Sequence, residues 1–205
     1  MCMEKTPWER PVEFHGHSCM GLAMGFRVAE AAMKSLGGER DVDEEMIAIM
    51  ENDSCAVDAV QVITGCTIGK GNMIVRDYGK KGYTFALRDK KKAVRITAKW
   101  PEGLMQDEFQ KLRESVFSNA ASEEDKARFK ELSAELLKDY LVKPLEEICE
   151  VKDIPYAVPE KARIFPSVTC SSCGEKVMEP RARLKEGKPT CIPCAHNYDR
   201  GWGSN

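Results

Sequence analysis

The chain has 205 residues, 42% of them hydrophobic, and a formal net charge of −2. This length can bury one core and leave residues for a small second module. The near balance of charge excludes a global field that would steer the protein to nucleic acid or to an anionic membrane. No segment approaches the roughly 18 apolar residues that span a bilayer, and the first residues lack the apolar core of a signal peptide. We therefore expect a cytoplasmic protein that does not act in a membrane.

The nine cysteines form an odd number, and most of them are grouped in short spacings. In a secreted protein such a count would suggest disulfides. In a reducing compartment it indicates metal or thiol chemistry instead.

The first cluster of metal-binding residue types precedes a predicted helix. Residues 19–36 have a helical pattern that ends at two glycines, and Ser18 is the expected N-cap. His15 and His17 come just before the helix, and Cys19 is placed in its first turn, where backbone amides and the helix dipole favour a thiolate. Such a cluster can bind a soft divalent metal, or Cys19 can act as an activated nucleophile. The structural alternative is that the histidines only satisfy hydrogen bonds at a turn.

A second helix is predicted at about residues 55–64, after an apolar strand at residues 46–51. Cys55 occupies the start of this helix, and Asp58 follows one turn later on the same side. The two helix N-termini are therefore expected to converge, which makes Cys55 a candidate site residue beside the first cluster. Cys66 follows the helix and would lie roughly 16 Å from Cys55 at 1.5 Å per residue. We do not expect these two thiols to share one metal within a single chain.

A glycine-rich loop reads Gly-Cys-Thr-Ile-Gly-Lys-Gly over residues 65–71. It is one residue short of the spacing of a phosphate-binding loop, and Gly71 stands where Ser or Thr would hold Mg²⁺, so an NTPase is excluded. The loop can still border a ligand pocket, where a hydroxyl and an ammonium group would orient an anionic ligand. The candidate pocket residues are His15, Asp58, Cys66, Thr67 and Lys70.

Three more strands are predicted after this loop, because apolar and polar residues alternate at residues 73–76, 83–88 and 93–98. The pattern becomes helical from about residue 101 to residue 150. Within that segment, Ser122 to Asp125 forms a capping box that starts a second amphipathic helix.

Prolines at positions 155, 159 and 166 indicate an extended linker after the helical segment. The sequence therefore predicts the α+β fold class with two parts. The first is an α+β domain over residues 1–152, with a helical segment at about 101–150. The second is a small four-cysteine zinc ribbon over residues 165–205.

The second part carries the strongest motif in the chain. Cys170 and Cys173 form one Cys-x-x-Cys pair and Cys191 and Cys194 form another, with 17 residues (174–190) between them. This is the spacing of a four-cysteine zinc site. A module of about forty residues cannot close a hydrophobic core, so the metal would supply its folding free energy. Disulfides, free thiols and a rubredoxin-like iron site are the alternatives.

Two longer motifs carry a resemblance to a known family. The first reads His-Gly-His-Ser-Cys-Met-Gly-Leu from His15, and the second runs from Asp53 to Asn72 and includes the glycine-rich loop. Together with the ribbon they resemble the FmdE family, which is named for a component of formylmethanofuran dehydrogenase, over most of residues 10–100 and the ribbon. The resemblance implies an α+β domain followed by a zinc ribbon, often a dimer, and an association with a molybdenum or tungsten enzyme of methanogenesis.

Two functional hypotheses follow. In the first, the protein is a metal- or thiol-dependent protein of one-carbon or redox metabolism. Its N-terminal pocket uses Cys19 and Cys55 as soft ligands of a second metal or as reactive thiolates, aided by His17. In the second, it is a non-catalytic accessory protein whose ribbon binds a larger enzyme or nucleic acid, through basic residues between the two cysteine pairs. The sequence does not decide whether the protein is an enzyme.

A homodimer is also expected. Gly21, Gly25 and Ala29 recur every four residues and form a stripe of small side chains on the first helix. Such a stripe allows another backbone to approach closely, and the family resemblance points to a dimer as well. Packing within the chain is the alternative use of the stripe.

Overall fold

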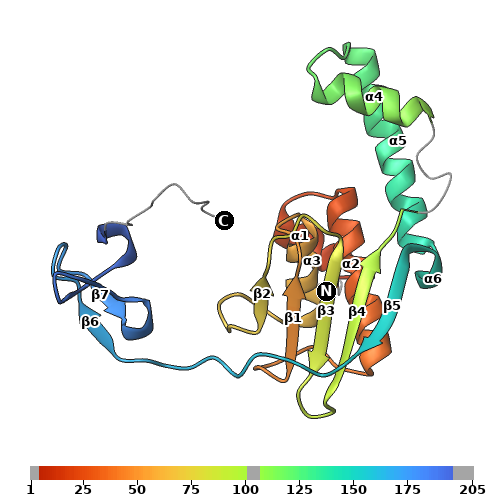
Figure 1. The fold of residues 1–205 in the computed structure, drawn as a ribbon. Coiled ribbons are helices and arrows are strands. Elements are labelled where there is room, and N and C mark those ends of the chain that lie inside the picture. The colour runs from red at the N-terminus through yellow and green to blue at the C-terminus, as the bar shows by residue number, and fades with distance from the viewer. Residues whose placement is uncertain (1–4, 101–106, 196–205) are drawn as a thin grey trace. The chain divides into compact units, whose positions relative to one another are not determined.

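A computed structural model describes residues 5–100 and 107–195. The chain divides into an N-terminal unit, Met1–Lys161, and a C-terminal unit, Ala162–Asn205. Helices and strands are mixed in the first unit, and the second contains a four-cysteine cluster, which confirms the predicted fold class (Figure 1).

A five-stranded sheet forms the centre of the N-terminal unit, with the strand order β2-β1-β3-β4-β5. Its strands are β1 (Met46–Met50), β2 (Met73–Val75), β3 (Gly82–Leu87), β4 (Lys92–Ala98) and β5 (Cys149–Ile154). β1 and β2 are parallel, and the other neighbouring pairs are antiparallel. All five residues of β1 are buried, as the unbroken apolar run in the sequence predicts.

Strand β5 has no counterpart among the predicted strands, because the sequence has a helical pattern almost up to this point. It pairs with β4, where Cys149 lies opposite Ala98 and Ile154 lies opposite Ala93. β5 is an edge strand, and most of its side chains are at least partly exposed. Its formation therefore depends on the long-range pairing with β4 more than on local sequence pattern.

Three helices cover one face of the sheet: α1 (Glu9–His15), α2 (Met20–Leu36) and α3 (Ala56–Thr64) (Figure 1). The predicted ends of α2 and α3 are confirmed, because Gly37 and Gly65 follow them in left-handed conformation. Buried side chains of α2 and α3 form one core with Tyr83 and Phe85 of the sheet. This core holds the N-termini of α2 and α3 in place.

The stripe of small residues on α2 faces α3 of the same chain. A Cβ at Gly25 would lie 2.3 Å from the carbonyl oxygen of Ala56, and one at Gly21 would lie 3.2 Å from Cys55 Cβ. Ala29 is fully buried. Packing within the chain is therefore the use of this stripe, and it offers no surface to a second copy.

A helical hairpin extends from the N-terminal unit and consists of α4 (Asp107–Phe117) and α5 (Glu123–Val142), followed by the short helix α6 (Leu145–Ile148) (Figure 1). The predicted capping box is confirmed, because Ser122 and Asp125 exchange hydrogen bonds at the start of α5. Among the helices in the described ranges, none is long and apolar enough to span a bilayer.

The C-terminal unit consists of two small hairpins. One pairs β6 (Ser167–Thr169) with β7 (Lys176–Met178), and the other pairs β8 (Arg183–Lys185) with β9 (Lys188–Thr190); single 3-10 turns occupy Glu179–Arg181 and Ile192–Cys194. In its described residues, the buried side chains are those of Cys170, Thr190 and Cys191. The unit therefore lacks an apolar core in this range.

Candidate metal centres

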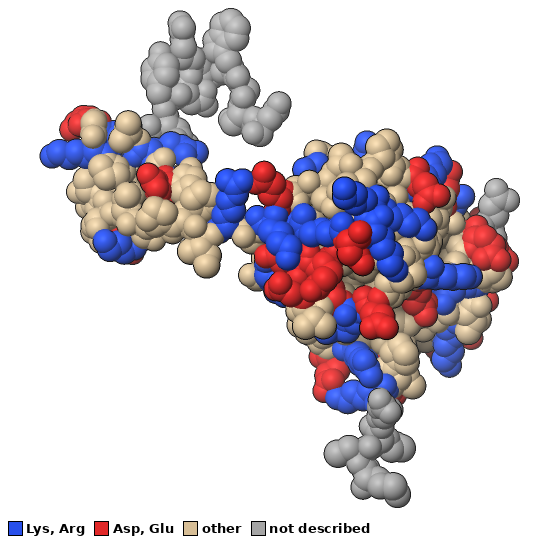
Figure 2. Space-filling model, turned by 90° about the horizontal axis from the view of Figure 1, so that it is seen from below, with Lys and Arg blue, Asp and Glu red and all other residues tan. Residues whose placement is uncertain are grey.

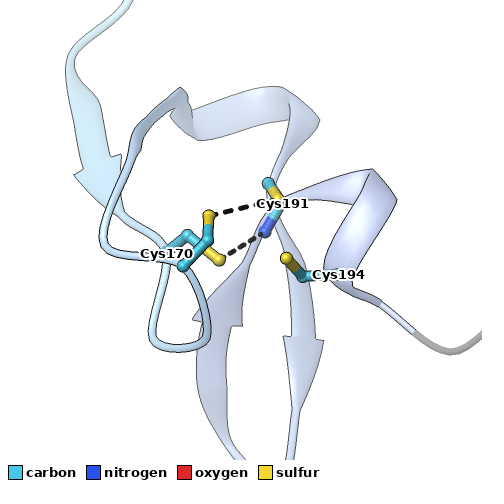
Figure 3. Close-up of side chains that lie close together, drawn as sticks. Cys170, Cys191 and Cys194 are labelled. Atoms are coloured by element: carbon cyan, nitrogen blue, oxygen red, sulfur yellow. Dashed lines mark hydrogen bonds between the residues drawn. The ribbon is translucent and has the colours of Figure 1, made fainter.

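The four cysteines of the C-terminal unit come together at one point. Their sulfur atoms all lie within 4.8 Å of one another, and Cys173 Sγ is 3.9 Å from Cys191 Sγ. Figure 3 shows the side chains of Cys170, Cys191 and Cys194 directed at one another. Four thiolates at about 2.3 Å from a tetrahedral zinc ion would be roughly 3.8 Å apart. The spacing fits zinc, as the sequence predicts.

Hydrogen bonds within this cluster shift the pKa values of two of its thiols in opposite directions. Backbone N–H groups of Cys173 and Cys191 lower the pKa of Cys170 to about 6, and the Cys191 N–H donates to Cys170 Sγ at 3.3 Å. Side-chain hydrogen bonds with Cys191 and Cys173 raise the pKa of Cys194 to about 12. Four thiolates in one place repel one another, so the cluster requires a cation to hold all of them ionised.

The N-terminal cluster forms where the chain turns from α1 into α2. His15 ends α1, and Gly16 follows with φ of +89°, a left-handed conformation that reverses the chain. The rings of His15 and His17 then lie 4.5 Å apart between centroids. One donor atom from each of His15, His17 and Cys19 falls within 4.8 Å of the other two.

Cys19 itself is the N-cap of α2, one residue later than the predicted Ser18. Its backbone is extended, and its Sγ accepts a hydrogen bond from the Leu22 N–H at 3.3 Å. The sulfur therefore replaces the oxygen acceptor that the sequence rule expects at this position. The positive end of the α2 dipole is directed at the thiol.

Asp58 holds His15 in a fixed orientation. Its Oδ2 is 2.7 Å from His15 Nδ1, and His15 Nε2 is 4.0 Å from Cys19 Sγ. With the proton on Nδ1 donated to the carboxylate, the lone pair of Nε2 faces the cluster. This carboxylate–histidine arrangement is the one that orients metal-binding imidazoles in proteins.

Cys55 lies beside Cys19, because α2 and α3 begin side by side. A Cβ at Gly21 would be 3.7 Å from Cys55 Sγ and 3.9 Å from Cys19 Sγ. Burial, followed by the neighbouring Cys19 thiol, raises the pKa of Cys55. The structure thus brings together five of the residues singled out in the sequence: His15, His17, Cys19, Cys55 and Asp58.

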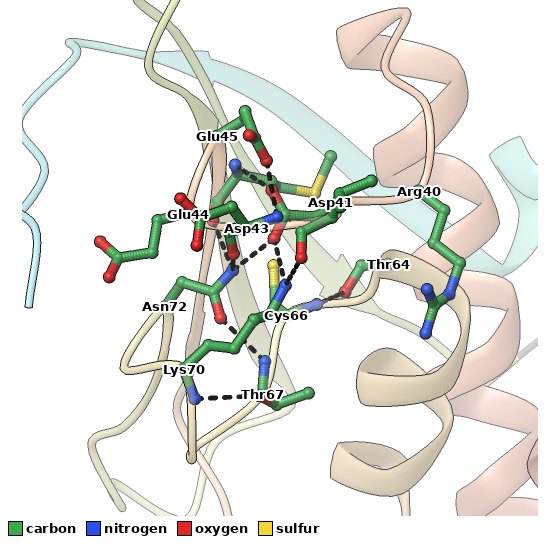
Figure 4. Close-up of polar contacts among 12 residues, drawn as sticks. Arg40, Asp41, Asp43, Glu44, Glu45, Thr64, Cys66, Thr67, Lys70 and Asn72 are labelled. Carbon is green, nitrogen blue, oxygen red and sulfur yellow. Dashed lines mark hydrogen bonds and ion pairs between the residues drawn. The ribbon is translucent and has the colours of Figure 1, made fainter.

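The other three candidate pocket residues lie in a separate hydrogen-bond network (Figure 4). Lys70 Nζ is 2.6 Å from Asp41 Oδ2, and the Lys70 N–H donates to Thr67 Oγ1 at 3.1 Å. The Cys66 N–H donates to Thr64 Oγ1, and burial raises the pKa of the Cys66 thiol to about 12. These contacts give Thr67 and Lys70 a structural role, and their role toward an anionic ligand stays a prediction.

Asp41 forms the centre of this network and is not among the residues predicted from the sequence. Its side chain is fully buried; Oδ2 accepts from Lys70 and from Asn72 Nδ2 at 2.7 Å, and Oδ1 accepts from the Met46 N–H at 2.7 Å. Asn72 Oδ1 accepts from the Thr67 N–H at 2.9 Å. No spacing in the sequence connects position 41 to the glycine-rich loop, so only the tertiary structure reveals that Asp41 holds the loop.

Family models match both units of the chain. Residues 14–150 match the model described as FmdE, molybdenum formylmethanofuran dehydrogenase operon. The chain belongs to the FmdE family. Residues 163–200 match the prokaryotic dksA/traR C4-type zinc finger, which agrees with the geometry of the four cysteines. The predicted family and the predicted ribbon zinc site are thereby confirmed.

Two individual proteins extend this comparison. A protein of Archaeoglobus fulgidus named "Probable S-adenosyl-L-methionine-binding protein" is 35% identical over 196 residues, which is 92% of this chain. This chain spans about half of that relative, 52% of its length. The crystal structure of a tungsten formylmethanofuran dehydrogenase FmdE-like protein from Syntrophus aciditrophicus has a TM-score of 0.58 at 24% identity, covering 91% of this chain and 88% of the other. At that identity the likeness establishes a shared fold.

Proposed function

We propose that this FmdE-family protein binds a soft divalent metal at His15, His17 and Cys19, in addition to its ribbon zinc. The observation that carries the proposal is the convergence of three metal-donor atoms within 4.8 Å, with Asp58 orienting one of the imidazoles. Two imidazoles and one thiolate suit zinc and similar divalent metals, and three protein ligands leave one position open.

The residues around this centre have distinct tasks. Asp58 keeps the acceptor nitrogen of His15 directed at the cluster, and the first turn of α2 donates the Leu22 N–H to Cys19 Sγ. Cys55 supplies a second thiol beside Cys19. A metal held there would supply Lewis-acid chemistry, and the chain would contribute ligands and a neighbouring thiol.

We propose a role in one-carbon or redox metabolism for this centre. The two related proteins have names that refer to S-adenosyl-L-methionine and to formylmethanofuran, which carry a methyl group and a formyl group. Soft thiol ligands beside an open metal position are suited to such group transfer. The name of the Syntrophus aciditrophicus protein also supports an association with a tungsten or molybdenum enzyme. We further propose a homodimer that uses a surface other than the α2 stripe, and a cytoplasmic location, where the free thiols would stay reduced.

Metal content tests the proposed centre. Intact protein loaded with Zn²⁺ and freed of excess metal should contain about two metal ions per chain by mass spectrometry, one for each cluster. Cys19→Ala should lose one equivalent and keep the ribbon zinc, and His17→Ala should weaken the second ion less, because water can replace one ligand. Cys149→Ala is the matched control, since Cys149 is a buried thiol that belongs to neither cluster. One metal per chain in the wild-type protein would refute the centre.

A second candidate function concerns the surface of the ribbon. Arg181, Arg183, Lys185 and Lys188 lie on or beside the β8–β9 hairpin, and in the described part of the chain none of them forms an ion pair with a carboxylate. Figure 2 shows a row of basic side chains along one side of the C-terminal unit, whereas both signs are mixed on the N-terminal unit. Leu184, between two of the basic residues, is 79% exposed.

As a second function, we propose that this basic surface binds the phosphate backbone of nucleic acid. Fluorescence anisotropy with labelled single-stranded and double-stranded oligonucleotides would measure the binding affinity. The double variant Arg183→Glu/Lys188→Glu should weaken binding and reduce its dependence on salt concentration. Binding that is absent at low salt, or unaffected by the double variant, would rule this second function out.

A further inference from the structure

The N-terminal site contains one thiol beyond the metal-binding group. Among the described cysteines of this unit, Cys19 and Cys55 are half-buried, whereas Cys66 and Cys149 are buried. The donor atoms that fall within 4.8 Å of one another belong to the two histidines and Cys19, and Cys55 is outside that group. A role for Cys55 therefore needs a separate explanation.

Cys55 and Cys19 border the same small volume. The point where a Cβ of Gly21 would stand is 3.7 Å from Cys55 Sγ and 3.9 Å from Cys19 Sγ. That point is also only 3.2 Å from Cys55 Cβ, so any side chain at position 21 would press on Cys55. Because Gly21 has no side chain, residue 21 places no side-chain atom at this point beside the two thiols.

No capping hydrogen bond holds the Cys55 side chain in its present orientation. Cys55 is the N-cap of α3 but makes no side-chain capping hydrogen bond, in contrast to Cys19. A rotation of Cys55 about χ1 therefore breaks no such capping contact. Both thiols also contact the same small apolar cluster, formed by Leu22, Phe26 and Ala59.

We propose that Cys19 and Cys55 form a reversible disulfide, and that its formation releases the metal from the N-terminal centre. This inference rests on the proposed function, because it describes the regulation of the same site. The thiolate, and not a disulfide sulfur, is the metal ligand. Oxidation thus leaves only the two histidines in the ligand set.

The oxidant is a low-molecular-weight disulfide. The Cys19 thiolate attacks one sulfur of the oxidant, forms a mixed disulfide and expels one thiolate. The Cys55 thiolate then attacks Cys19 Sγ, forms the Cys19–Cys55 bond and expels the second thiolate. Two electrons pass from the protein to the oxidant, and the two expelled thiolates take up the two protons of the protein thiols. A dithiol reductant reverses both steps.

Peptide mapping of the full chain tests the disulfide. Reduced protein that carries its ribbon zinc but no metal at the N-terminal centre is treated with oxidised glutathione, blocked with iodoacetamide, and digested with trypsin and an endoprotease that cleaves before aspartate. This digestion places Cys19 in the peptide of residues 6–27, Cys55 in 53–57 and Cys66 in 58–70. We expect a link between peptides 6–27 and 53–57 that disappears after treatment with dithiothreitol.

Two variants and a metal titration complete the test. Cys55→Ser should stop at the mixed disulfide and retain one glutathionyl group on Cys19, whereas the control Cys149→Ser should form the link like wild type. The oxidised protein should bind Zn²⁺ at the N-terminal centre at least about tenfold more weakly, because losing a ligand should cost no less than losing a residue that only orients one. His15→Ala should still form the disulfide, because the thiols do not need the histidine for exchange.

The outcomes separate this inference from the proposed function. If the reduced protein binds the second metal, but treatment with oxidised glutathione never links Cys19 to Cys55, the disulfide is overturned and the metal centre stands. If oxidation links the two thiols, but the reduced protein binds only the ribbon zinc, the metal centre is overturned. The proposed release of metal is then overturned as well. A link from Cys19 to the Cys66 peptide would also overturn the assignment.

Discussion

At the scale of single residues, the pair of Asp58 and His15 is central to the N-terminal site. The carboxylate comes from the first turn of α3, and the imidazole comes from the last turn of α1. Their 2.7 Å contact determines which imidazole nitrogen faces Cys19. A metal-binding role for His15 therefore depends on a residue 43 positions away in the sequence.

Asp58→Asn is expected to weaken the second metal about 10- to 100-fold, which is the usual effect of losing a carboxylate behind a metal-binding histidine. The amide has nearly the same shape, so the fold should be retained. Competition with a chromogenic chelator measures the affinity, and Asp53→Asn, at an exposed position before α3, is the matched control. Equal affinities for the two variants would argue against the role of Asp58.

Cys66 provides a prediction about pH. Burial raises the pKa of its thiol from about 9 to about 12, so the thiol stays neutral in the folded state at pH values where it ionises in the unfolded state. Its contribution to stability is complete below about pH 9 and is lost as the pH rises through 12. The free energy of unfolding should therefore fall with rising pH in this window.

The variant Cys66→Ala should be less stable than wild type at about pH 7.5, because it leaves a cavity, but the difference should shrink in alkaline solution. The wild type should lose roughly 1.4 kcal/mol more per pH unit above about pH 9 than the variant. Urea unfolding followed by circular dichroism at neutral pH and at two alkaline pH values gives the curves. Parallel curves for the two proteins would contradict a thiol that is kept neutral by burial.

At the scale of elements, the close contact of α2 and α3 positions the site. Gly25 lets the backbone of Ala56 approach α2, and this approach brings Cys55 beside Cys19. The small-residue stripe, which in the sequence indicated a surface for another chain, is thus used to bring two helix N-termini together. Two helix dipoles then act on the same pair of thiols.

Gly25→Ala is expected to destabilise the N-terminal unit by about 2 kcal/mol or more, because overpacking forces the helices apart. The added methyl group would stand 2.3 Å from the Ala56 carbonyl oxygen. Gly69→Ala is the matched control, since a Cβ at Gly69 meets no atom within 4 Å. Equal stabilities of the two variants in urea unfolding would show that α2 and α3 are not in this close contact.

At the scale of the whole molecule, the two units have different sources of stability. The N-terminal unit buries a large apolar core between its sheet and its helices. The described part of the C-terminal unit buries little besides two cysteines and a threonine. A unit of this kind depends on its metal for folding free energy.

Cys173→Ser should therefore unfold the C-terminal unit and remove one zinc ion per chain, while the N-terminal unit keeps its stability within about 0.5 kcal/mol. Limited proteolysis should cut the variant after about residue 165, and metal analysis should show the missing ion. Ser172→Ala, at the exposed neighbouring position, should behave like wild type. A Cys173→Ser protein with its full zinc content would disprove the ribbon site.

Features that depend on residues close together in the chain could be predicted from the sequence. The spacing of the four ribbon cysteines indicates a shared metal, and glycines in left-handed conformation end α2 and α3. An unbroken apolar run forms the buried strand β1, and side-chain capping starts α5. Contacts between residues far apart in the chain could not be predicted in this way, because they depend on the tertiary structure. Asp58 meets His15, Asp41 meets Lys70 and Asn72, and β5 pairs with β4, because core packing and sheet pairing bring them together, and neither leaves a local pattern in the sequence.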